Sequence, residues 1–123
     1  MTHRTAVVVG GASGIGRAVA HALAADGCRV TVADRNTDGA RAVAAEIGDP
    51  HTAATVEVTD EGSVRALFEH ADTLHAVVNT AGYSGVGLIT DLAVEDFRYV
   101  VDVCLTGAFL VSPWVVAFTW TKK

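Results

Sequence analysis

Strand-like and helix-like runs alternate along this chain of 123 residues. The strand-like runs begin near Thr5, Arg29, Thr52 and Leu74, and helical runs lie near residues 13–26, 38–47 and 61–70. Parallel neighbouring strands need a crossover connection, and that connection is usually a helix. The alternation therefore predicts an α/β fold with a parallel sheet and flanking helices.

Glycines follow the first strand-like run, whose residues 7–9 are all valine. Gly10, Gly14 and Gly16 turn the chain from that strand into a helix that extends to Ala25. Such a turn leaves free backbone N–H groups at the start of the helix, where the helix dipole also favours negative charge. The turn predicts a phosphate site, although a tight glycine turn that binds nothing has the same pattern.

Asp34 ends the second strand-like run, which is rich in β-branched residues. It follows the glycines by about one βα unit, the distance at which a carboxylate accepts hydrogen bonds from the adenosine ribose of a dinucleotide. A solvated acid at a strand end, or a cap for the next helix, is the alternative. Together with the glycines, Asp34 favours a ribose-binding role.

The charge balance and the apolar pattern indicate a soluble domain. The chain has 9 Lys or Arg against 14 Asp or Glu, a formal net charge of -5, so we expect no nucleic-acid partner. The apolar stretches look too short and too interrupted to cross a bilayer, and the first residues lack a signal peptide. We therefore expect a cytoplasmic protein with no membrane partner.

The cysteines and histidines suggest neither a disulfide framework nor a metal centre. Cys28 and Cys104 lie far apart in the sequence, which fits reduced thiols. The histidines show no metal-ligand spacing with cysteine, and we expect no metal site; they are His3, His21, His51, His70 and His75.

A fourth helix is expected from about Val94 through at least Leu110. Its apolar residues follow the three-and-four spacing of a buried stripe, which we expect to comprise Phe97, Val100, Val101, Cys104, Leu105, Ala108 and Phe109.

Several ordered motifs resemble the amino-terminal half of the short-chain dehydrogenase/reductase family. In chain order they occupy residues 9–16, Asp34 at its strand end, and residues 57–60, 79–82 and 102–107, and the resemblance extends to about Ser112. It implies a truncated Rossmann-like, doubly wound parallel sheet in the order 3-2-1-4.

The resemblance also implies roles for individual residues around a dinucleotide. The pyrophosphate and the nearby ribose would contact Gly10, Ser13, Gly14, Ile15 and Gly16. Asp34 would hold the adenosine ribose. The adenine would lie near Glu57 and Val58, and the passage toward the nicotinamide would be lined by Asn79, Ala81 and Gly82.

Asp34 also bears on cofactor choice, since its carboxylate would repel the 2′-phosphate of NADP. NAD is therefore favoured over NADP. Arg35 complicates this expectation, because its guanidinium could fold over the adenine or attract a 2′-phosphate.

The chain departs from the family pattern at positions that matter for chemistry. Val9 replaces a threonine, so a hydroxyl that stabilises the glycine loop is absent, and Thr80 replaces an asparagine. Cys104 stands where the family has an asparagine of its catalytic set; a small buried residue is favoured there over a reactive cysteine. Neither Tyr83 nor Tyr99 begins the family's Tyr-x-x-x-Lys motif.

We therefore expect no catalytic residue in this chain and consider several functions. The first is the NAD(P)-binding half of an oxidoreductase that acts on an alcohol/carbonyl pair and is inactive alone. A non-catalytic dinucleotide-binding or protein-interaction module is the alternative, and an active enzyme completed by another polypeptide is a further one. A small alcohol or carbonyl substrate is expected only for the full-length parent.

We divide the chain into a dinucleotide-binding domain, residues 1–112, and a divergent apolar tail, residues 113–123. The tail could be a kinked continuation of the fourth helix, a short strand, or the product of a truncated or frame-altered reading frame. An unpaired strand edge at residues 74–78 and the apolar tail predict a homo-oligomer, with the tail and the fourth helix in its interface.

Overall fold

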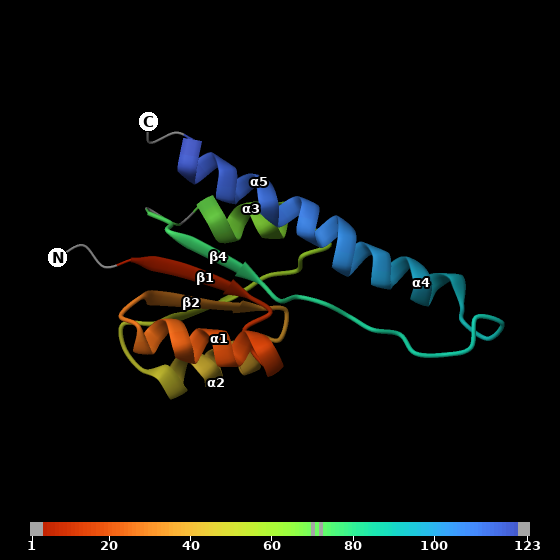
Figure 1. Ribbon diagram of the computed structural model, residues 1–123, viewed down its shortest axis with the longest axis horizontal. Coiled ribbons are helices and arrows are strands. Elements are labelled where there is room, and N and C mark those ends of the chain that lie inside the picture. The colour runs from red at the N-terminus through yellow and green to blue at the C-terminus, as the bar shows by residue number, and fades with distance from the viewer. Residues whose placement is uncertain (1–3, 70, 72, 121–123) are drawn as a thin grey trace.

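The computed structural model describes residues 4–69, 71 and 73–120 (Figure 1). Its elements, in chain order, are β1 Thr5–Val9, α1 Gly14–Ala25, β2 Arg29–Asp34, α2 Thr37–Ile47, β3 Thr52–Thr55, α3 Glu61–Glu69, β4 Ala76–Asn79, α4 Val94–Val101, the π-helical turn η1 Asp102–Thr106, and α5 Gly107–Trp120. The predicted alternation of strands and helices is confirmed. His70, the predicted end of the third helix, lies outside the described residues.

The strands form one 4-stranded parallel sheet in the predicted order β3-β2-β1-β4. β1 is interior, and its Val8 pairs with Val32 on one side and Val78 on the other. β4 is an edge strand of the described sheet. The carboxyl ends of β1, β2 and β4 consequently lie next to one another, where doubly wound folds bind ligands.

Alternate residues of each strand supply two separate cores. Val7 and Val9 point to the face that is covered by α3 and α5, whereas Ala6 and Val8 point to the face that is covered by α1 and α2 (Figure 1). A strand buried on both faces reads as a continuous apolar run, which explains the consecutive valines of β1.

The last part of the described chain is one continuous helix through α4, η1 and α5 (Figure 1). It passes through Pro113 without ending, so among the alternatives for the tail the structure shows helical continuation rather than a strand. Proline has no backbone N–H for the helix ladder, and Ser112 beside it donates its hydroxyl to the Ala108 carbonyl at 2.6 Å. The boundary that we expected between residues 112 and 113 therefore lies inside α5.

The predicted buried stripe of this helix is wrong. Phe97, Leu105 and Phe109 are 64%, 68% and 70% exposed, and Cys104 is exposed as well. Up to Val115, the buried residues are instead Val103, Gly107 and Val111, spaced by four; Val103 and Val111 pack in the core with β1, and Gly107 lies against Val58. The helix therefore buries a narrow line against the sheet and leaves its widest apolar face to solvent.

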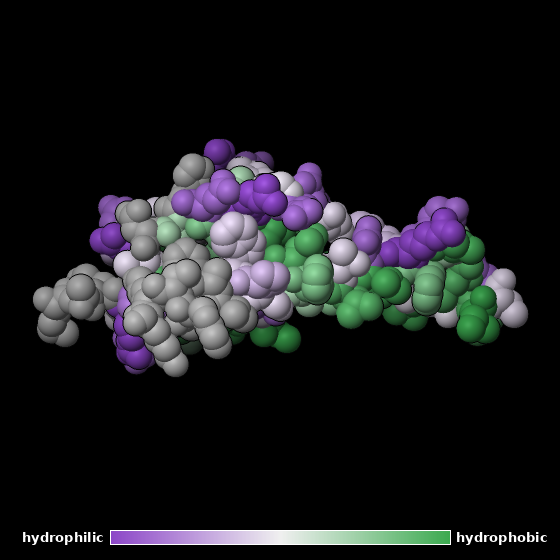
Figure 2. Space-filling view, turned by 90° about the horizontal axis from the view of Figure 1, so that it is seen from above, coloured by the Kyte–Doolittle hydropathy of each residue, from purple (hydrophilic) through white to green (hydrophobic). Residues whose placement is uncertain are grey.

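Loop residues extend the exposed apolar face. Figure 2 shows hydrophobic side chains along the part of the molecule that projects beyond the sheet. We call this surface the α4 face; its residues are Val86, Leu88, Ile89, Leu92, Val94, Phe97, Leu105 and Phe109.

The expectation that no apolar stretch is long enough to cross a bilayer is also wrong. Among the described residues, the helix Val94–Val115 has 22 residues and contains an 18-residue window with a mean hydropathy of 1.2, which suffices by length and composition. Only 17% of that window is buried. Because Val103 and Val111 belong to the core beside the sheet and Trp114 packs against that core, we interpret this helix as part of the folded domain.

The contact between Phe68 and Trp114 allows a test of how much the packing of α5 on α3 contributes to stability. Phe68 on α3 is 1% exposed and stacks on Trp114 of α5, with ring centroids 5.8 Å apart. We expect Phe68→Ala to lower the free energy of unfolding by about 3–5 kcal/mol, because it leaves a cavity. Urea denaturation followed by circular dichroism measures the change.

Phe97→Ala is the matched control, because it removes the same side chain from the exposed α4 face. It should change the free energy of unfolding by roughly 0.5 kcal/mol or less when the protein is diluted to its monomer. Equal losses in both variants would contradict the described packing.

Candidate functional site

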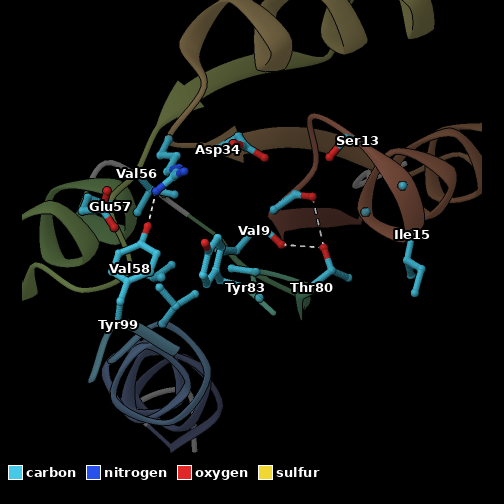
Figure 3. Close-up of a pocket in the computed structure, with 17 residues that line it drawn as sticks. Val9, Ser13, Ile15, Asp34, Val56, Glu57, Val58, Thr80, Tyr83 and Tyr99 are labelled. Carbon is cyan, nitrogen blue, oxygen red and sulfur yellow. Dashed lines mark hydrogen bonds between the residues drawn. The ribbon is translucent and has the colours of Figure 1, made fainter. Parts of the chain in front are cut away.

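A cavity of about 370 Å³ opens at the carboxyl ends of β1, β2 and β4 (Figure 3). All the site residues predicted from the sequence, except Asn79, line it: Gly10, Ser13, Gly14, Ile15, Gly16, Asp34, Arg35, Glu57, Val58, Ala81 and Gly82. Segments far apart in the sequence thus meet where the resemblance places a dinucleotide.

The glycine turn is held against the neighbouring strand and helix. Gly10 N and Gly11 N both donate to the Ala33 carbonyl, at 2.8 and 3.1 Å. A Cβ on Gly16 would lie 2.1 Å from the Gly10 carbonyl oxygen, so only glycine lets α1 approach β1 this closely. The start of α1 is therefore fixed beside the carboxyl end of β1.

The open side of the same turn fits an anionic group. A Cβ on Gly14, where φ is 55°, would meet no atom within 4 Å, so this backbone borders free space in the cavity. Ser13 is the N-cap of α1, and its side chain makes no capping hydrogen bond. The first N–H groups of α1 and the Ser13 hydroxyl can thus receive a phosphate.

Backbone hydrogen bonds fix the carboxylate of Asp34 at the end of β2. Its Oδ2 accepts from Ala12 N at 3.1 Å, and its Oδ1 accepts from Asn36 N at 2.9 Å. Asp34 is half-buried on the cavity wall. Carboxylate oxygens have spare lone pairs, so Asp34 can still accept from the hydroxyls of a sugar.

Glu57 and Val58 form the part of the wall that follows β3. The Glu57 carboxylate accepts from the Thr59 hydroxyl at 3.0 Å, and Glu57 N donates to the Ser63 hydroxyl at 2.9 Å. Val58 is buried against the long helix, where a Cβ on Gly107 would lie only 3.0 Å from it. This wall offers an apolar surface beside a carboxylate.

Thr80 has a part in the site that the sequence did not reveal. Its hydroxyl lies 2.9 Å from the Val9 carbonyl and 3.1 Å from the Gly10 carbonyl, and it donates to this pair (Figure 3). Val9 itself cannot supply a hydroxyl to the turn. Thr80, which follows β4, thus supplies the turn with the hydroxyl that we expected to be absent because residue 9 is valine.

Asn79 does not line the cavity. Its side-chain oxygen accepts from Ala81 N at 3.1 Å and so shapes the turn that brings Ala81 and Gly82 to the cavity wall. Asn79 supports the site from outside it.

Two aromatic residues of the wall were also missed as binding residues. Tyr83 follows β4, Tyr99 lies on α4, and their rings meet edge to face with centroids 4.9 Å apart. Cys104 lies in η1, five residues beyond Tyr99. It is exposed rather than buried, and its thiol donates to the Tyr83 carbonyl at 3.5 Å. No local pattern distinguishes such tyrosines from surface residues.

Known proteins share sequence with most of this chain. The family model described as short chain dehydrogenase matches residues 4–122, which extends past Ser112. A 3-alpha-(or 20-beta)-hydroxysteroid dehydrogenase of Mycobacterium tuberculosis and a human 3-oxoacyl-[acyl-carrier-protein] reductase are each 36% identical over 111 residues, which is 87% of this chain and 43% and 47% of those proteins. A sorbitol dehydrogenase of Cereibacter sphaeroides is 34% identical over 112 residues, 88% of this chain and 44% of that protein. The chain spans less than half the length of these curated relatives.

The hydroxyl of Thr80 can be tested by a pair of substitutions. Thr80→Val keeps the shape but removes the donor to the turn, and we expect a loss of about 1 kcal/mol in unfolding free energy. Amide hydrogen exchange should accelerate in residues 10–16. Thr80→Ser retains the hydroxyl and should keep the slow exchange; equal exchange in both variants would show that the hydroxyl does not order the turn.

Proposed function

This chain belongs to the short-chain dehydrogenase family, and from that premise we propose that it is the dinucleotide-binding part of an oxidoreductase. Proteins of this family use NAD(P) cofactors. The observation that supports the proposal best is the cavity at the carboxyl ends of β1, β2 and β4, where the glycine turn and Asp34 meet.

The parent reaction that we propose is hydride transfer between an alcohol and a carbonyl. The relatives are named as dehydrogenases and a reductase, and a bound nicotinamide would carry the hydride. This chain contributes the binding residues, and we assign no catalytic residue to it. The alternative proposal is a non-catalytic dinucleotide-binding or protein-interaction module.

We propose NAD rather than NADP as the preferred cofactor. The Asp34 carboxylate is held on the wall by two backbone N–H groups, so it cannot easily turn away from a ligand. A carboxylate in that place accepts from ribose hydroxyls and repels a 2′-phosphate.

Asp34→Ala tests the assignment of the ribose site. We expect NAD affinity to fall about tenfold, because hydrogen bonds to a charged acceptor are lost, and the preference for NAD over NADP to narrow. Isothermal titration calorimetry with each cofactor measures both effects.

Asp38→Ala is the matched control, since it removes the same carboxylate from an exposed position in the first turn of α2. It should leave both affinities nearly unchanged. Absence of any NAD binding to the unmodified chain would refute the proposed function.

We also propose that the α4 face is covered by a second copy of the chain. Large apolar side chains gather on it without a covering element among the described residues (Figure 2). Such a surface favours association. We propose the cytoplasm as the compartment, because the exposed free thiol of Cys104 fits reducing conditions.

Leu105→Glu tests the association. It places a charge in the α4 face and should shift the protein toward the monomer in light scattering at micromolar concentration. Ala42→Glu, at an exposed position of α2, adds the same charge on the other side of the sheet and should leave the oligomer intact. A monomeric unmodified chain would contradict this proposal.

A further inference from the structure

Arg35 and Tyr99 join two walls of the cavity. Arg35 follows Asp34 at the end of β2, and Tyr99 lies on α4. The Arg35 guanidinium donates to the Tyr99 phenol oxygen through Nη1, and its central carbon lies 5.9 Å from the centroid of the Tyr99 ring. Figure 3 shows Tyr99 reaching into the cavity from α4, opposite Asp34.

Tyr99 is itself supported from the side. The ring of Tyr83 packs against it edge to face, at an interplanar angle of 73°. Both rings line the cavity, so the phenol that holds Arg35 belongs to a packed wall. A support of this kind restricts where the guanidinium can lie.

Tyr99 does not neutralise the positive charge of Arg35. Ion pairs among the described residues involve Arg4, Arg17 and Arg65, each with a carboxylate, but none includes Arg35. Tyr99 is a neutral hydrogen-bond acceptor. Arg35 is therefore a full positive charge at the cavity, next in sequence to the carboxylate that favours NAD.

We propose that Tyr99 is a positioning residue that sets cofactor preference by holding Arg35. The inference rests on the proposed dinucleotide function. We expect Arg35 to leave the Tyr99 hydroxyl when its guanidinium turns toward a 2′-phosphate, whereas NAD has no phosphate at that position and leaves the pair intact. The lost hydrogen bond thus weakens NADP binding and not NAD binding.

Tyr99→Phe removes the hydroxyl and keeps the ring that packs on Tyr83. We expect the NADP dissociation constant to fall about tenfold, the factor that one such hydrogen bond supplies, while the NAD value changes less than about twofold. Thr90→Val is the control, because it also removes one hydroxyl but at an exposed position that does not line the cavity, and both dissociation constants should remain near those of the unmodified chain.

Arg35→Ala separates positioning from a general effect on the fold. In the Arg35→Ala background, Tyr99→Phe should no longer improve NADP binding. The inference is overturned if Tyr99→Phe leaves NADP binding unchanged or weaker, or if the gain persists without Arg35. If the unmodified chain binds NAD, only the inference fails; if it binds neither cofactor, the proposed function fails as well.

Discussion

The close approach of α1 to β1 is the constraint on which the cavity depends. At Gly16 there is no room for even one side-chain carbon beside the Gly10 carbonyl. This contact brings the start of α1 to the carboxyl end of the central strand, while the Ala33 carbonyl anchors the turn to β2. A wider separation would move the helix N–H groups away from Asp34, and the proposed phosphate and ribose sites would no longer lie side by side.

Local patterns were sufficient to predict the sheet. Strand-like runs that alternate with helices favour a parallel sheet, and the consecutive valines of β1 are typical of a strand that is buried on both faces. The strand order was predicted from the family resemblance and is confirmed. Gly10, Gly14 and Asp34 line the cavity, and they could be picked out in the sequence because glycine turns and strand ends have local patterns.

The long helix and the contacts between distant segments could not be predicted in this way. Periodicity reveals that a helix has an apolar face, but only its neighbours decide whether that face is buried. Phe97 and Phe109 have the spacing of core residues, yet the helix packs through Val103 and Val111. Arg35 and Tyr99 are 64 positions apart, so no window of the sequence contains their pairing.

The hydrogen bond of Thr80 bears on how the protein folds during translation. Its hydroxyl reaches the Val9 carbonyl across 71 positions of the sequence. Translation proceeds from the amino terminus, so the glycine turn is synthesised long before its donor, and closing so long a loop is a slow, entropically costly step. The hydrogen bonds of the turn are therefore completed only after β4 has been synthesised and has paired with β1.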